Sequence, residues 1–292
     1  RYMLAPNGAL VAKAIREKVT AGTKVLIIGA GLIGLKCAEA LHHLNADITV
    51  VDLADRILPS ILDVRAGEIM QKHIEDKGTK FILGTSVEQF SKNSAKLTNG
   101  ETVDFDILVI AVGVRPNTEL VSDAGGKVEK DIITDLHQQT TIDNVYAAGD
   151  CTVSHDCSSN TDRILALLPN AFMQGEVAGK NMAGEETLYL NAIPMNAIGF
   201  YGLHIITAGS YDGDEDITED ADKEIYKKLV FKDGLLKGFI LMGDVARAGI
   251  YTSMIKEQIP LTEVDLDLLR DKPQMMMFGK ARREEKLAGK KH

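Results

Sequence analysis

A glycine-rich turn between a predicted strand and a predicted helix holds the residues whose spacing could do chemistry. Val25–Ile28 is an apolar run of strand length that continues directly into G-A-G-L-I-G. Glycines at this spacing permit a tight turn, close approach of backbone amides to a phosphate, and close packing of the helix on the strand. The start of the helix adds partial positive charge, which favours an anion. The predicted pyrophosphate site consists of Gly29, Ala30, Gly31, Leu32, Ile33 and Gly34.

An acidic residue at the end of the next predicted strand completes the pattern of a dinucleotide site. Ile48–Val51 is apolar and leads into Asp52, about 20 residues beyond the turn. A carboxylate there accepts hydrogen bonds from the adenosine ribose hydroxyls, each contributing roughly 1.5–3 kcal/mol, and repels a 2′-phosphate. Arg56, the nearest cation and a further candidate contact, weakens this preference slightly. We therefore predict NAD(H) rather than NADP(H); the alternative is a βαβ unit that binds no nucleotide.

The elements that must position these residues alternate between strand and helix. Asp63–Lys77 is a predicted helix, and a hairpin at Asn99-Gly100 leads back to a buried strand at Ile107–Val112. Short predicted strands fill the C-terminal third, where Asp212–Asp222 is expected to be an acidic loop without the ligand spacing of a calcium site. The residues expected to face inward on the first helix are Ile33, Cys37, Ala40, Leu41 and Leu44.

Length, charge and cysteine content exclude several classes of protein. A chain of 292 residues predicts two or three domains. The net charge of −9, from 33 basic and 42 acidic residues, argues against a nucleic-acid or anionic-membrane partner. We find no apolar run of membrane-spanning length and no signal peptide, which predicts a cytoplasmic protein. The three cysteines lack a C-x-x-C pair, so we predict neither a disulfide framework nor a metal site.

Four features in order along the chain resemble the FAD-dependent pyridine nucleotide-disulfide oxidoreductases. They are the Gly29–Asp52 unit, V-G-V-R-P-N from residue 112, the segment Thr141–Asp150 and the predicted helix from Pro169. The likeness is to the branch with NADH:rubredoxin oxidoreductase, NADH oxidase and the flavin region of NADH-dependent nitrite reductase. It implies an α/β chain: a Rossmann-like NAD-binding domain with an antiparallel insertion (1–117), the C-terminal part of an FAD-binding domain (118–192) and an α+β interface domain (193–292).

The resemblance also implies roles for residues beyond the glycine turn. Arg115 and Asn117 lie on the return loop expected near the nicotinamide, and Gly113 begins that loop. Gly149 lets the backbone approach FAD. Asp150 is expected to accept a hydrogen bond from a ribityl hydroxyl of the flavin. The helix that starts with Pro169 and Asn170 is expected to direct its amides at the isoalloxazine. No side chain is predicted to act as a catalytic acid, base or nucleophile.

The implied function is hydride transfer from NADH to FAD and onward to an acceptor: rubredoxin, oxygen, nitrite through a partner, or a disulfide. A homodimer is one assembly that the resemblance allows. The family's N-terminal flavin half does not occur in this sequence, so we expect this chain to be a fragment. The intact protein is expected to bind FAD, and the isolated fragment is expected to hold it weakly if at all. Lys36 stands where relatives usually carry Glu, and Ser154-His155-Asp156 is not expected to form a triad. The alternatives are an NAD(H)-binding module without turnover and a purely structural protein.

Overall fold

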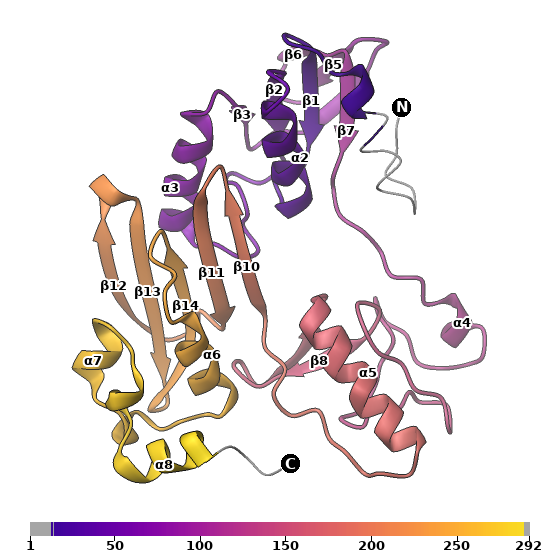
Figure 1. The fold of residues 1–292 in the computed structure, drawn as a ribbon. Coiled ribbons are helices and arrows are strands. Elements are labelled where there is room, and N and C mark those ends of the chain that lie inside the picture. Colours follow the sequence, from indigo (N-terminus) through magenta and orange to yellow (C-terminus); the bar gives the residue numbers. More distant parts are fainter. Residues whose placement is uncertain (1–12, 14, 289–292) are drawn as a thin grey trace. The chain divides into compact units, whose positions relative to one another are not determined.

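The computed structural model describes residue 13 and residues 15–288, which fall into two compact units (Figure 1). The first unit takes in the described residues up to Val114 together with Ile198–His204. The second takes in Arg115–Ala197 and the described residues from Ile205 onward. None of the helices in the described part of the chain is both long and apolar enough to cross a lipid bilayer.

The first unit is built on a four-stranded parallel sheet with the order β3-β2-β1-β7. Parallel neighbours need crossover connections, and two helices supply them between β1 and β3. The central strands are apolar, and Leu26 and Val50 are fully buried. This arrangement confirms the predicted Rossmann-like sheet. The elements are β1 (Lys24–Ile28), α2 (Leu32–His42), β2 (Asp47–Val51), α3 (Val64–Glu75), β3 (Lys80–Ile82) and β7 (Ile107–Ile110).

The buried face of α2 differs from the predicted one. Gly34, Leu35, Ala38 and Leu41 face inward, whereas Ile33 is 48% exposed. Successive side chains on a helix are separated by about 100°, so the closest contact decides which stripe turns inward. That contact is made by Gly34. The prediction that Ile33 and Ala40 face inward is therefore wrong, because both are exposed, whereas the prediction for Leu41 is confirmed.

A three-stranded antiparallel insertion lies between β3 and β7 in the sequence. The predicted Asn99-Gly100 turn is confirmed, because it joins two paired strands and Gly100 has a φ of +92°. Ala95 and Phe105 from the insertion share a hydrophobic cluster with Leu26 of β1. The insertion therefore packs on the parallel sheet. Its strands are β4 (Val87–Phe90), β5 (Ser94–Leu97) and β6 (Thr102–Asp104).

The second unit begins with irregular chain, a short hairpin and a long helix. Pro169 lies in the first turn of that helix, where its missing N–H is not needed. Leu165 and Tyr189 pack with Val177 of the helix in a small buried cluster. The elements are α4 (Glu119–Ser122), β8 (Val153–Asp156), β9 (Thr161–Ile164) and α5 (Leu168–Met182).

A five-stranded antiparallel sheet with the order β10-β11-β14-β13-β12 dominates the rest of the chain. Helix α6 packs against β14, where Phe239 and Tyr251 are fully buried with ring centroids 5.4 Å apart. The strands are β10 (Met195–Phe200), β11 (Leu203–Gly209), β12 (Asp214–Asp220), β13 (Ile225–Lys232) and β14 (Leu235–Met242). The helices are η1 (Ala221–Lys223), α6 (Ala248–Lys256), η2 (Leu261–Glu263), α7 (Leu266–Arg270), η3 (Met275–Met277) and α8 (Lys280–Ala288).

Strand β12 corrects the prediction that Asp212–Asp222 forms a loop. Its residues pair antiparallel with β13 along the edge of the sheet. Edge strands tolerate charge because their outer side faces water, and basic neighbours balance these carboxylates. Glu215 pairs with Lys228, and Arg270 Nε lies 2.6 Å from Asp216 Oδ2. Backbone pairing therefore prevails over the loop-like composition.

Two glycine-to-alanine substitutions should change thermal stability in opposite directions. A Cβ on Gly34 would lie 1.9 Å from Gly29 O, a backbone atom, whereas a Cβ on Gly179 within α5 meets no described atom within 4 Å. We expect Gly34→Ala to lower stability by about 1–3 kcal/mol through overpacking. Gly179→Ala should raise it by about 0.4–1 kcal/mol through reduced chain entropy. Tm measurements check both, and a parent-like Tm for Gly34→Ala would contradict the described packing.

Candidate functional site

Two glycines at the junction of β1 and α2 leave no room for a side chain: Gly29 lies in the turn and Gly34 in the first turn of the helix. Gly29 has a φ of +112°, and a Cβ there would lie 2.4 Å from the carbonyl oxygen of Ala111. A Cβ on Gly34 would lie 1.9 Å from the carbonyl oxygen of Gly29. The Gly29 amide also donates to Val51 O at 2.8 Å. The turn is thus held against both neighbouring strands of the parallel sheet.

The remaining glycine of the motif, Gly31, leaves the start of α2 open to a ligand. Gly31 is the N-cap residue of α2 and provides no side-chain cap. A Cβ at this position would meet no atom of the described residues within 4 Å. The first amides of a helix lack carbonyl partners within the helix and carry partial positive charge. An open, uncapped helix start of this kind fits a pyrophosphate group.

Asp52 lies beside this turn and is hydrogen-bonded to it. Its Oδ2 accepts a hydrogen bond from Ala30 N at 2.6 Å, and its Oδ1 accepts one from Ala54 N at 2.7 Å. Each carboxylate oxygen has a second lone pair, so the group keeps acceptor capacity for ribose hydroxyls. The structure therefore brings together the glycines and the acid that the sequence separates.

Arg56 lies near the same strand end but has a different set of neighbours. Its Nη1 is 3.2 Å from Asp55 Oδ1, and its Nε is buried without a hydrogen-bond partner in the described part of the chain. The stem of the side chain lies along Gly67 of α3. The guanidinium is thus held by Asp55 and the stem lies along α3, while the Nε–H remains an unused donor.

The loop that follows β7 divides between the two compact units. Gly113 has a φ of +105°, and its neighbours Val112 and Val114 are 71% and 86% exposed. Arg115 is also exposed, and it is the first residue of the second unit. Gly113 therefore belongs to the same unit as the glycine turn, and Arg115 belongs to the other unit.

Gly149 and the start of α5 lie together within the second unit. Gly149 has a φ of +93°, its amide donates to Gln174 Oε1 at 2.7 Å, and a Cβ there would lie 3.7 Å from the Cβ of Ala171. Asp150 follows and is exposed. Helix α5 has no side-chain cap from its N-cap residue Leu167. A free helix start, a glycine and an exposed carboxylate suit the anionic and hydroxyl groups of FAD.

The side chain of Asn170 has a structural role. It is 3% exposed, donates from Nδ2 to Ile193 O at 3.2 Å and accepts from the Tyr189 hydroxyl at 2.8 Å. Burial raises the pKa of Tyr189, so its hydroxyl keeps the proton that it donates. Only the backbone of Asn170 remains available to a ligand at the start of α5.

Sequence reasoning missed Gln174. This residue is 1% exposed and joins the Gly149 amide to the Ser154 hydroxyl. The available signal was an amide on the same helical stripe as Asn170 and Val177, which are also buried. A buried amide on an inward stripe needs polar partners, and here it fixes the turn before Asp150.

The prediction that Ser154, His155 and Asp156 form no triad is confirmed. Ser154 bonds to Gln174, while His155 Nδ1 lies 2.8 Å from Asp162 Oδ1. Asp156 accepts a hydrogen bond from the Ser158 hydroxyl at 2.6 Å.

The three cysteines are free, and burial raises the pKa of each thiol, which disfavours the reactive thiolate.

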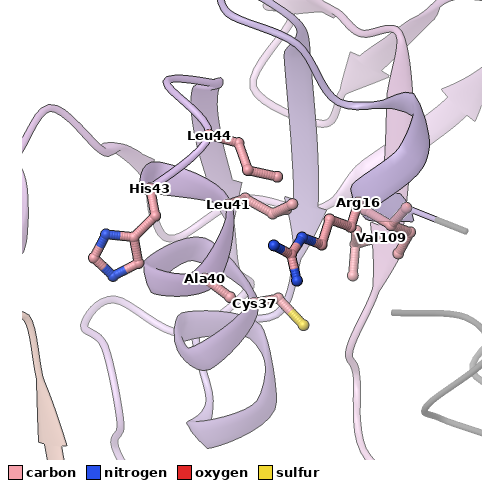
Figure 2. Close-up of a pocket in the computed structure, with 8 residues that line it drawn as sticks. Arg16, Cys37, Ala40, Leu41, His43, Leu44 and Val109 are labelled. Carbon is pink, nitrogen blue, oxygen red and sulfur yellow. The ribbon is translucent and has the colours of Figure 1, made fainter. Parts of the chain in front are cut away.

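A pocket of about 380 Å³ lies on a different face of α2 (Figure 2). Figure 2 shows the Arg16 guanidinium directed toward helix α2 beside the sulfur of Cys37. The pocket contains neither the glycines nor Asp52, so we assign it no part in dinucleotide binding. It is lined by Ile15, Arg16, Cys37, Ala40, Leu41, His43, Leu44 and Val109.

Two family models match the chain, one after the other along the sequence. Residues 9–175 match the family model described as pyridine nucleotide-disulphide oxidoreductase, and residues 194–259 match the rubredoxin NAD+ reductase C-terminal domain. The NADH-dependent phenylglyoxylate dehydrogenase subunit epsilon of Aromatoleum evansii is 31% identical over 85% of this chain and 61% of its own. Rubredoxin-NAD(+) reductase of Acinetobacter baylyi is 29% identical over 90% of this chain and 66% of its own.

Solved structures include a similar NAD-dependent persulfide reductase from A. fulgidus. It is 26% identical, has a TM-score of 0.78 and covers 89% of this chain, which spans 53% of the reductase. The chain thus spans less than two thirds of the length of each of these three proteins. The family model nevertheless covers more than half of the chain and includes the glycine turn, Asp52 and the Gly149 segment. The chain belongs to the pyridine nucleotide-disulphide oxidoreductase family.

Proposed function

We propose that this chain binds NADH and contributes to the FAD site of a flavin-dependent oxidoreductase. The observation that carries the proposal is the bond from the Ala30 amide to Asp52, 2.6 Å long, beside the open start of α2. A phosphate site and a ribose site are thereby adjacent, as a dinucleotide requires. On this proposal residues 1–117 form the NAD-binding domain, 118–192 part of the FAD-binding domain and 193–292 the interface domain.

The glycine turn and Asp52 would hold the adenosine half of NADH. The amides of residues 31–34 at the start of α2 would donate to the pyrophosphate, with Gly31 leaving room for its approach. The amides of Gly29 and Ala30 hold the turn in place through Val51 O and Asp52. Asp52 accepts from the ribose hydroxyls and excludes a 2′-phosphate by charge repulsion. Arg56, held by Asp55 and α3, leaves this preference for NADH in place. Gly113 would border the nicotinamide end, and Arg115 is proposed to approach it.

The segment around Gly149 would hold FAD. Asp150 would accept from a ribityl hydroxyl, and the backbone amides of α5 beyond Pro169 and Asn170 would favour negative charge on the flavin. Gln174 positions this segment through its bond to the Gly149 amide. When bound, NADH supplies a hydride and FAD accepts it. The protein's part is to align the two rings and to exclude water from them.

We propose a small electron carrier of the rubredoxin type as the acceptor. The match of residues 194–259 to the rubredoxin NAD+ reductase C-terminal domain supports this choice. Relatives named NADH oxidase and nitrite reductase make oxygen and nitrite the competing acceptors, and a disulfide is the fourth. In the absence of oxygen, the rate of NADH oxidation should be higher with rubredoxin as acceptor than with nitrite or a disulfide. It should also be higher than the rate of oxygen consumption measured in air with NADH alone. A higher rate with oxygen would overturn the choice.

Reversing the charge at position 52 should reverse the cofactor preference. Asp52→Arg removes the acceptor for the ribose hydroxyls and introduces a cation that can pair with a 2′-phosphate. We expect the Kd for NADH to rise about tenfold or more and the Kd for NADPH to fall, both measured by cofactor fluorescence. Asp76→Arg places the same cation on an exposed residue at the C-terminal end of α3, away from the glycine turn, and should retain the parent's preference. If the parent binds NADH and Asp52→Arg still prefers NADH over NADPH to the same degree, the role assigned to Asp52 is refuted.

Asp150 should determine the affinity for flavin. Because this chain by itself is expected to hold FAD weakly, the purified chain is titrated with FAD without desalting, and NADH should bleach the bound flavin in the absence of oxygen. Asp150→Ala should bind flavin more weakly, whereas Asp143→Ala removes a nearby exposed carboxylate and should behave like the parent. NADH binding without any flavin binding, with the intact mass verified, would favour the non-catalytic NAD(H)-binding module instead.

A further inference from the structure

The turn between β10 and β11 belongs to the same compact unit as the glycine turn. This tip, residues 198–204, is distant from α2 in the sequence but is grouped with it by proximity. Tyr201 and Gly202 have φ values of +50° and +91°, which are typical of a tight two-residue hairpin turn. The tip is therefore a compact structure with its own contacts, and those contacts converge on two helices.

The first set of contacts joins the tip to α2. Glu39 Oε1 accepts a hydrogen bond from Tyr201 N at 2.6 Å, and Glu39 Oε2 lies 2.6 Å from Lys36 Nζ. The Lys36 ammonium also donates to Gly199 O and lies 5.0 Å from the ring centroid of Phe200. Hydrogen bonds with one charged partner are stronger than neutral ones. Lys36, the departure from the family pattern, thus fastens the tip.

The second set of contacts joins the tip to α3 and to the chain that enters β3. Tyr201 O lies 3.3 Å from His73 Nε2, and the Tyr201 hydroxyl lies 3.3 Å from Thr79 Oγ1. His73 and Thr79 are both buried. The His42 ring of α2 meets the Tyr201 ring edge to face with centroids 5.2 Å apart. Tyr201 therefore bridges the two helices that connect the strands of the parallel sheet.

We propose that Glu39 and Tyr201 are positioning residues for dinucleotide binding. Helix α2 is held on its inner face by the sheet and on its outer face by the tip. Its first turn supplies the amides assigned to the pyrophosphate, so the tip fixes those amides in the binding geometry before the ligand arrives. The inference rests on the proposed NADH site. Because coupling between two binding events is reciprocal, bound NADH must hold the tip more firmly by the same factor.

Substitutions at Glu39 test the coupling directly. Glu39→Ala removes the acceptor for the Tyr201 amide and the partner of Lys36, and we expect the Kd for NADH to rise about fivefold or more. Glu39→Gln keeps an acceptor oxygen for that amide and should restore most of the affinity. Glu68→Ala is the matched control, because it removes an ion pair of 3.0 Å at the same i,i+3 spacing on α3. It should bind NADH as the parent does.

Hydrogen exchange at the tip separates failure of this inference from failure of the proposed function. The Tyr201 amide should exchange faster in Glu39→Ala than in the parent without ligand, and NADH should slow its exchange in the parent. A parent that binds NADH, with equal Kd in Glu39→Ala, overturns the positioning role. A parent that does not bind NADH overturns the proposed function. In that case, a Tyr201 amide that exchanges at the same rate in Glu39→Ala as in the parent shows that Glu39 does not hold the tip, and the inference is overturned as well.

Discussion

The close approach of α2 to the glycine turn is the contact on which the rest of the first unit depends. Space for it exists only because Gly34 has no side chain, since a Cβ there would lie 1.9 Å from Gly29 O. The same approach turns Leu35 and Ala38 toward the sheet and leaves the start of the helix open at Gly31. One steric requirement thereby sets the rotation of the helix, its buried face and its exposed amides.

Helix α2 serves several purposes on different faces. Its inner face packs on the parallel sheet, its start is open to an anion, and Lys36 and Glu39 contact the 198–204 tip. Cys37 and Leu44 border the apolar pocket of Figure 2. Because a helix distributes side chains around its axis by about 100° per residue, these roles do not compete for the same positions. They are nevertheless coupled, since a shift of the helix would alter all of them.

The two proposed cofactor segments follow one physical scheme. Each combines the start of a helix that lacks a side-chain cap with a glycine of positive φ, Gly29 in one unit and Gly149 in the other. Free amides supply partial positive charge for anionic groups, and the glycine allows the backbone to come close. They differ in what holds the turn: a carboxylate, Asp52, in the first case and a buried amide, Gln174, in the second.

The sequence by itself determined the features that depend on neighbours along the chain. Spacing alone placed the glycine turn and Asp52, and the Asn99-Gly100 hairpin followed from the backbone freedom of Asn and Gly. Tertiary structure decided the rest. The exposure of Ile33 depends on the Gly34 contact, β12 forms because β13 offers an unpaired edge, and Gln174 and Glu39 acquire partners through distant contacts. Local patterns cannot encode such contacts, because their energy comes from residues that only folding brings together.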